Sequence, residues 1–164
     1  MVTKTPAPSN PAQPTAEDFL RLDGQVCFAL YSASLAMTKV YQPLLVELGL
    51  TYPQYLVMLI LWEDEGITVS SIGERLFLDS GTLTPLLKRM QAAGLVTRTR
   101  DSTDERRVLI GLTDAGRALR QQALAIPPCI LESTGCSIPE LGELVARLNA
   151  LRGQLAAAVP GASP

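Results

Sequence analysis

The sequence predicts a mainly α-helical domain with one small β-hairpin, and two observations carry that prediction. Apolar residues recur at helical spacing along most of the chain, and the clearest stripe occupies positions i, i+3, i+4 and i+7: Leu83, Leu86, Leu87 and Met90. After this stripe come two runs rich in β-forming residues, 95–100 and 107–112, on either side of the polar loop 101–106. A long helix therefore leads directly into a hairpin with a basic tip.

The helix that carries the stripe has recognisable ends and two different faces. Asp79 or Ser80 can cap its start, and Gly94 stands where a left-handed residue would close its end. Pro85 lies just past the first turn, where it forfeits one helical hydrogen bond. The face opposite the stripe carries short hydroxyl groups and cations of the kind that contact base edges and phosphates: Ser80, Thr82, Thr84, Lys88 and Arg89.

A helix followed by a basic hairpin is the arrangement of the recognition helix and wing in a winged helix-turn-helix domain. Residues 69–76 fit the first helix of that motif, and residues 78–81 fit its turn. We therefore predict a winged helix-turn-helix at about residues 53–113.

The charge distribution favours a nucleic-acid partner, although the whole chain has a net charge of −2. Residues 86–120 hold eight Lys or Arg against four Asp or Glu, so this segment carries +4. A basic patch on an acidic body is typical of a DNA-binding surface. A solvated charged face is the alternative on charge alone, and the motif decides for double-stranded DNA.

The remaining composition bounds the domain organisation. Residues 1–16 are polar and Pro-rich, so we expect a disordered tail rather than a signal peptide, and residues 160–164 are expected to fray. Residues 17–159 then form a single domain. Three cysteines without a secretory leader suggest reduced thiols in a cytoplasmic protein, and no run is long and apolar enough to span a membrane. The absence of histidine removes His-based triads and most zinc sites, so no metal or cofactor is expected.

The segments outside the winged motif, about 17–48 and 114–159, are predicted to be dimerisation helices. The stretch from Gly24 to Thr38 carries no charge, and a helix that is apolar all round must be buried all round. In a chain this small such burial requires a partner subunit, so we expect a homodimer. This helix can start at Thr15 or Asp23, and Pro43 should break or kink it.

Three further helices are predicted. One opens at residues 51–54, with Pro53 in its first turn, and continues through residues 55–62. Another covers residues 114–126, until Pro127 and Pro128 end or kink it. The last, at residues 138–159, is strongly periodic and is expected to join the first helix in dimerisation.

Cys27 lies in the uncharged helix, where a small buried hydrophobe is the ordinary interpretation. Its tyrosine neighbours suggest a reactive thiol instead. Tyr31 is one turn away, whereas Tyr41 returns to the same helix face roughly 21 Å further along the axis. In two antiparallel copies of the helix, Tyr41 of one copy would lie near Cys27 of the other, with Tyr52 just beyond. Phenol hydroxyls that donate to sulfur favour the nucleophilic thiolate, unless these tyrosines are ordinary interface aromatics.

Cys129 and Cys136 flank the predicted junction between the last two long helices. A thiol that is oxidised to sulfenic acid needs a second thiol to form a disulfide. Either cysteine could serve, and in a dimer the bond could cross between subunits. Incidental thiols are the alternative for each.

Four stretches of the chain resemble the MarR family of transcriptional regulators. DERRVLIGLT, at residues 104–113, looks like the D-x-R…L-x-L-T wing signature of the wider family. The other three look like its OhrR group, the repressors that sense organic hydroperoxides: QVCFALYSASLAMTKVYQPLL, LTYPQYLVMLILWE and LFLDSGTLTPLLKRM. The resemblance covers roughly residues 22–155.

The resemblance implies a dimeric repressor that leaves a pseudo-palindromic operator when an organic hydroperoxide oxidises Cys27. Tyr41 and Tyr52 would form hydrogen bonds to this sensor thiol from the other subunit, with Tyr31 in the same pocket. The later cysteines imply a two-cysteine sensor with an intersubunit disulfide. Its resolving thiol would be Cys136, with a rival in Cys129.

The same resemblance implies how DNA is bound. The polar face of the recognition helix would meet the major groove or its phosphates through Ser80, Thr82, Thr84, Lys88 and Arg89. Asp104 would shape the wing, and Arg106 would reach a minor groove.

Three alternatives stay open at this point. The first is a MarR-type repressor that is gated by a small aromatic ligand and has structural cysteines. The second is a thiol peroxidase that uses Cys27 catalytically, which would leave the basic helix and wing without a purpose. The third is a structural nucleoid protein, whose mark would be sequence-independent binding with a steep salt dependence.

Overall fold

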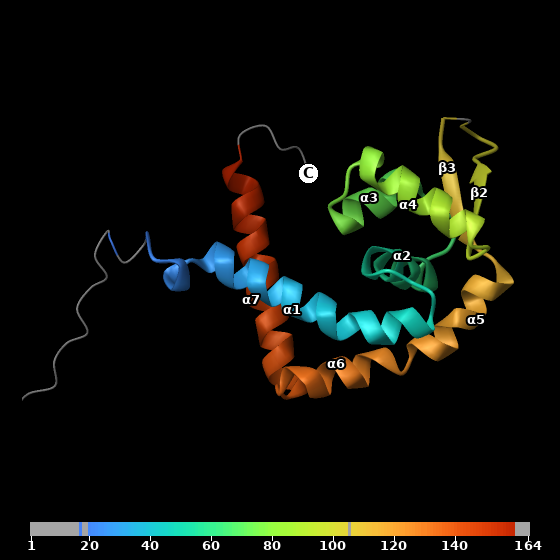
Figure 1. Cartoon of the computed structure of the whole chain (residues 1–164). Coiled ribbons are helices and arrows are strands. Elements are labelled where there is room, and N and C mark those ends of the chain that lie inside the picture. Colours follow the sequence, from blue (N-terminus) through green and yellow to red (C-terminus); the bar gives the residue numbers. More distant parts are fainter. Residues whose placement is uncertain (1–16, 18–19, 105, 160–164) are drawn as a thin grey trace, which may run out of the picture. The chain divides into compact units, whose positions relative to one another are not determined.

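The computed structural model describes residues 17, 20–104 and 106–159, and Figure 1 shows its helices and strands. As predicted, the described chain is mainly helical with a small antiparallel sheet. The elements in chain order are a 3₁₀ helix (Leu22–Gly24), α1 (Val26–Glu47), α2 (Tyr52–Glu63), β1 (Ile67–Thr68), α3 (Val69–Leu76), α4 (Ser80–Ala92), β2 (Val96–Arg100), β3 (Val108–Leu112), α5 (Asp114–Ala123), α6 (Ile126–Thr134) and α7 (Ile138–Ala158). The predicted tail at 1–16 and the predicted frayed end at 160–164 lie outside the described residues.

The chain divides into two compact units, residues 1–37 and residues 38–164, and α1 begins in the first and ends in the second. The predicted helix start at Asp23 is wrong. Asp23 lies inside the 3₁₀ helix, and Gln25 after it is extended, with φ −85° and ψ 116°. This extended residue separates the two helices. The other predicted start, Thr15, lies outside the described residues.

Pro43 was predicted to break or kink this helix, and the break is wrong, because α1 continues through this proline to Glu47. A proline inside a helix removes one backbone hydrogen bond. The helix continues because Leu45, two residues later, is only 2% exposed and anchors this turn in the core. α1 ends before Gly49, which has a φ of 65°, and the Leu50 N–H donates to the Leu45 carbonyl at 2.9 Å.

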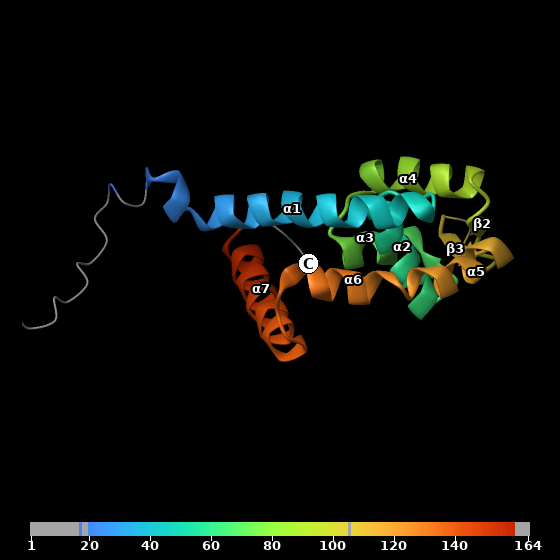
Figure 2. The same cartoon turned by 60° about the horizontal axis from the view of Figure 1, so that its bottom comes forward.

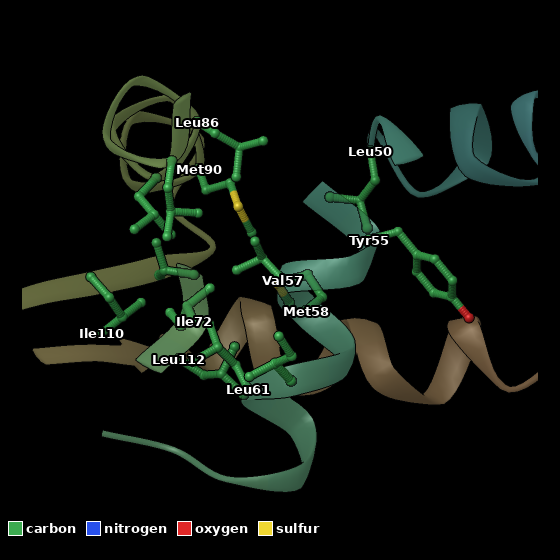
Figure 3. Packing of buried hydrophobic residues seen from close by; sticks show 14 of the residues in the cluster. Leu50, Tyr55, Val57, Met58, Leu61, Ile72, Leu86, Met90, Ile110 and Leu112 are labelled. Carbon is green, nitrogen blue, oxygen red and sulfur yellow. The ribbon is translucent and has the colours of Figure 1, made fainter. Parts of the chain in front are cut away.

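α2 is the central helix of the second unit and contacts α3, α4 and α5 (Figure 2). It begins at Tyr52, within the predicted opening at residues 51–54, because the Thr51 N–H donates to the Gln54 side chain at 2.8 Å and Pro53 fits the first turn. Apolar side chains of α2, the helix-turn-helix and the sheet form the core (Figure 3). Those fully buried include Val57, Met58, Leu61, Ile72, Leu83, Leu87, Met90 and Ile110.

α3 and α4 form the predicted helix-turn-helix. α3 has the predicted bounds, and Asp79 caps α4 by accepting a hydrogen bond from the Thr82 N–H at 2.8 Å. Gly94 follows α4 with a φ of 72°, as predicted. The turn covers residues 77–79 rather than 78–81, because the Asp79 cap lets the helix begin at the next residue.

β2 and β3 form the predicted hairpin, paired antiparallel with Val96 opposite Leu112 and Arg100 opposite Val108. β1 adds a third strand on the other side of β3, and its Ile67 lies opposite Ile110. The sequence did not predict β1, because two residues are too few to show an alternating pattern.

The C-terminal third is helical. α5 ends at Ala123, three residues before the predicted end, and α6, which the sequence did not predict, begins at Ile126 because the two prolines fit its first turn. No residue of α7 is buried within the described chain. Large apolar side chains of α1 and α7 are exposed in the single chain: Val26, Tyr31, Leu35, Val46, Leu144, Val145, Leu148 and Leu155.

No single helix among the described residues is both long and apolar enough to cross a membrane, although α1 and α2 together, as a bent pair, have the length and composition to do so.

Candidate nucleic-acid interface and thiol sites

The recognition helix α4 has one buried and one exposed face, divided as the sequence predicts. The stripe that begins with Leu83 is buried in the core. Thr84, named among the DNA-facing residues, is only half exposed. The other four residues of the predicted DNA-facing set are exposed: Ser80, Thr82, Lys88 and Arg89. The polar face of α4 is therefore open to solvent along its length.

Two hydrogen bonds from Thr82 to Asp79 stabilise the first turn of α4. The Thr82 hydroxyl donates to Asp79 Oδ2 at 2.9 Å, while the Thr82 N–H donates to Asp79 Oδ1. The Thr82 N–H, followed by its hydroxyl, holds the pKa of the Asp79 carboxyl below its usual value. The Thr82 hydroxyl therefore donates its proton to Asp79, and its oxygen can only accept a hydrogen bond from another group.

The tip of the wing is shaped by two aspartates. Asp104 Oδ1 accepts a hydrogen bond from the Arg106 N–H at 3.0 Å, which leaves the Arg106 side chain exposed. Asp101 Oδ1 accepts hydrogen bonds from the Thr103 hydroxyl at 2.6 Å and the Thr103 N–H at 2.9 Å. These bonds, the hydroxyl first, hold the pKa of Asp101 below its usual value. Sequence reasoning missed Asp101, although an Asp two residues before a Thr in a loop is a turn signal.

The basic segment is smaller than its composition suggests, because Arg117 is neutralised. Its Nε and a terminal nitrogen donate to the two carboxylate oxygens of Glu65 at 3.0 and 2.7 Å, and its other terminal nitrogen lies 3.2 Å from Asp114. The hydrogen bond from Arg117 lowers the pKa of Glu65, and the bond to Glu65 raises the pKa of Arg117. Arg117 therefore joins α5 to the loop before β1 and is not free to bind a phosphate.

All three cysteines are free thiols. Cys27 is the second residue of α1 and is exposed in the single chain. Cys129 is exposed on α6. Cys136 lies between α6 and α7, half buried, and its thiol donates to the Thr134 carbonyl at 3.6 Å. The prediction that both later cysteines flank one junction is therefore wrong for Cys129, which lies within the unpredicted helix α6, whereas Cys136 lies at the junction of α6 and α7.

The second unit holds a cluster of aromatic rings at the end of α1. The centroids of the Tyr41 and Tyr52 rings are 4.9 Å apart, and those of Tyr41 and Tyr55 are 5.8 Å apart. Burial, followed by the neighbouring phenols, raises the pKa of Tyr41 to about 12, and burial raises the pKa of Tyr52. A phenol is protonated at neutral pH even at its ordinary pKa, so both hydroxyl groups can donate. Tyr55 was not predicted to lie in this group, and Tyr31 is an exposed residue of the first unit.

Comparison with known proteins identifies the family. A model of the SarA/Rot transcriptional regulators matches residues 39–123. The chain is also 52% identical over 134 residues to the organic hydroperoxide resistance transcriptional regulator of Bacillus subtilis (strain 168), a match that covers 82% of this chain and 91% of that one. The chain belongs to this family of MarR-type winged-helix regulators. The family consists of transcriptional regulators, which removes the thiol-peroxidase alternative.

Other members give similar matches. The chain is 49% identical over 150 residues to the HTH-type transcriptional regulator TtmR of Methylorubrum extorquens (strain PA1), which covers 92% of this chain and 77% of that one. The structure of AbfR of Staphylococcus epidermidis has been solved in its reduced form bound to DNA. It is 38% identical to this chain with a TM-score of 0.70, and the match covers 86% of this chain and 99% of AbfR. The structure of its disulfide form matches with 39% identity and a TM-score of 0.57, and this match covers 85% of this chain and 92% of AbfR.

Proposed function

We propose that this regulator is a homodimeric repressor that binds operator DNA when reduced and leaves it when an organic hydroperoxide oxidises Cys27. The observation that carries the proposal is the pair of protonated phenols Tyr41 and Tyr52, because two adjacent donors suit a thiolate. The relative from Bacillus subtilis is named for organic hydroperoxide resistance, and AbfR has a reduced DNA-bound form and a disulfide form.

In the proposed dimer, the apolar faces of α1 and α7 cover one another. A helix with exposed Val26, Leu35 and Val46 gains free energy when a second copy removes that surface from water. Two antiparallel α1 helices would bring Tyr41 and Tyr52 of one subunit toward Cys27 of the other.

DNA binding would use α4 and the wing of each subunit. Two α4 helices about 34–36 Å apart can enter successive major grooves on one side of the duplex. Lys88 and Arg89 would meet phosphates or base edges, and Arg106 at the wing tip would enter the minor groove. The exposure of these side chains supports this assignment.

The proposed chemistry starts with the Cys27 thiolate. It attacks one oxygen of the hydroperoxide, the O–O bond breaks, and the alkoxide takes a proton and leaves as the alcohol. Cys27 is then a sulfenic acid. The thiol of Cys136, or of its rival Cys129, attacks that sulfur, forms a disulfide and releases water. A bond from the junction of α6 and α7 to α1 of the partner would shift the dimerisation helices and change the separation of the two α4 helices.

A cavity of about 350 Å³ beside Tyr52 supports an organic rather than an inorganic peroxide as the oxidant. Its lining is mainly apolar and comes from the end of α1 and the start of α2: Thr38, Gln42, Leu45, Val46, Leu50, Thr51, Tyr52 and Pro53. Such a space suits an alkyl or aryl group. The same cavity also favours the second candidate function, a repressor gated by a small aromatic ligand.

Gel-shift assays with cumene hydroperoxide separate the two functions. Wild-type protein should leave its operator on peroxide treatment and return after a thiol reductant is added. Cys27→Ser should bind the operator as tightly as wild type and stay bound in peroxide, while Cys136→Ser should slow or prevent disulfide formation. If Cys27→Ser still leaves the operator in peroxide, the sensor assignment is wrong.

A further inference from the structure

Phe77, in the turn of the helix-turn-helix, combines a strained backbone with an exposed ring. It has φ 56° and ψ 38°, and it is the only residue other than glycine with a positive φ in the described part of the chain. Bulky side chains rarely adopt this left-handed region, which suits glycine and asparagine. The Phe77 side chain is 68% exposed, so burial of the ring does not offset the strain.

The ring of Phe77 contacts the last helix. Arg152 Cζ of α7 lies 4.3 Å from the ring centroid, a distance at which a guanidinium group and an aromatic face attract each other. Arg152 forms no ion pair with any described residue. Beside this contact, a groove of about 890 Å³ is lined by α3 and the start of α4 on one side and by Ala156 and Ala157 of α7 on the other. The Arg152–Phe77 contact therefore bridges two elements that are otherwise loosely packed.

The turn that contains Phe77 is rigid enough to transmit its position to α4. A Cβ atom at Gly73 would lie 2.7 Å from the Leu78 carbonyl oxygen, so this turn lies directly against α3. The next residue, Asp79, caps α4. A displacement of Phe77 therefore moves the start of the recognition helix.

We propose that the contact between Arg152 and Phe77 positions the recognition helix relative to the dimerisation helix and so sets the operator affinity of the reduced protein. This inference rests on the proposed function, because α7 would lie at the dimer interface. With α7 fixed there, the contact helps to set the separation of the two α4 helices. Movement of α7 after disulfide formation would break it.

A double-mutant cycle in reductant tests this positioning role. Phe77→Asn removes the ring and suits the left-handed backbone, and Arg152→Met removes the charge but keeps an apolar stem. Each single variant should weaken binding about two- to five-fold, the expected effect of one exposed cation–π contact. The double variant should bind the operator with about the affinity of the single variant that binds it less tightly, because the contact is already lost in each single variant. The probe is a fluorescent duplex that the reduced wild-type protein selects from a random pool.

Further readouts separate positioning from a general effect on the fold. Phe77→Asn should have a free energy of urea unfolding at least equal to that of wild type, because the strain is relieved. Phe77→Tyr and Arg152→Lys, which keep the ring and the charge, should restore affinity. Arg147→Met is the matched control, because Arg147 lies on the same helix but pairs with Glu143 at 2.7 Å.

The outcomes distinguish this inference from the proposed function. If the reduced wild-type protein selects no duplex, the proposed function fails. If it selects one and the two substitutions act additively or have no effect, only the positioning role fails. The slope of log affinity against log salt concentration gives a further test. If Arg152→Met lowers this slope by about one phosphate contact and Phe77→Asn does not, the positioning role is also overturned, because Arg152 would then bind DNA directly.

Discussion

The rings of Tyr41 and Tyr52 lie 4.9 Å apart, although Tyr41 lies within the C-terminal half of α1 and Tyr52 is the first residue of α2. The two helices join through the Gly49 turn, so the pair is fixed by local structure within one chain. In the proposed dimer this pair serves a thiol of the other subunit. A sensor built in this way is complete only in the dimer.

Loss of either phenol should slow the oxidation of Cys27. In Tyr41→Phe and Tyr52→Phe the ring packing is kept and one donor to the thiolate is lost. A hydrogen bond to a charged group corresponds to about a tenfold change in rate or more. The rate of sulfenic acid formation can be followed with a dimedone-based probe after rapid mixing with cumene hydroperoxide. Tyr55→Phe, in the same aromatic cluster, should react at the wild-type rate, and equal slowing in all three variants would contradict the specific roles.

Alkaline pH should destabilise the protein in part through Tyr41. Folding raises the pKa of this phenol from 10.0 to about 12, so the folded state holds the proton more tightly than the unfolded state. The stabilisation is present below pH 10 and is lost as the pH rises toward 12. Urea unfolding, monitored by Trp62 fluorescence across this range, should show a smaller loss for Tyr41→Phe than for wild type. Identical pH profiles would show that the burial of this phenol has no effect on stability.

Lys88 and Arg117 should respond differently to neutralisation, although both lie in the basic segment. Lys88→Gln should weaken DNA binding and lower the salt slope by about 1, because one phosphate contact is lost. Arg117→Gln should leave the slope unchanged, since Glu65 and Asp114 already hold that guanidinium. Binding isotherms at several salt concentrations measure both. A reduced slope in Arg117→Gln would place this arginine on DNA.

Gly116 should not tolerate a side chain. A Cβ atom there would lie 2.1 Å from the Leu95 carbonyl oxygen, and the Gly116 carbonyl accepts a hydrogen bond from Trp62 Nε1 at 2.9 Å. Gly116→Ala should lower the free energy of unfolding by about 1–3 kcal/mol, a typical cost of overpacking. Gly142→Ala is the control, because nothing lies within 4 Å of its Cβ position. Denaturant unfolding of both variants tests the difference, and equal stability would contradict the close contact.

The elements predicted correctly from the sequence are those that local patterns determine. The apolar stripe and the cap at Asp79 fix α4, and the β-rich runs fix the hairpin. The paired prolines were misplaced as the end of α5, because a proline also fits the first turn of a new helix, α6. Pro43 was misjudged because its local cost is outweighed by the burial of Leu45, a tertiary effect. The two-residue β1 exists only because β3 pairs with it.

The sequence predicts residue types for the proposed site but not how they pair in the structure. The phenols Tyr41 and Tyr52 were expected together, whereas Tyr55 reads as an ordinary core residue until the helices pack. The neutralisation of Arg117 depends on Glu65, which is 52 residues away in the chain. Composition alone therefore overstated the basic surface. Long-range pairs of this kind have no signature in a single sequence.

The central claim, that Cys27 is the peroxide sensor, is tested most directly by mapping the oxidised thiols. Purified protein is treated with cumene hydroperoxide, separated by non-reducing gel electrophoresis and analysed by peptide mass spectrometry. We predict a disulfide-linked dimer that joins Cys27 to Cys136 of the partner chain, and linkage to Cys129 would keep the mechanism and change the resolving residue. Unmodified Cys27 in excess peroxide would contradict the account and leave a repressor that is gated by a bound ligand.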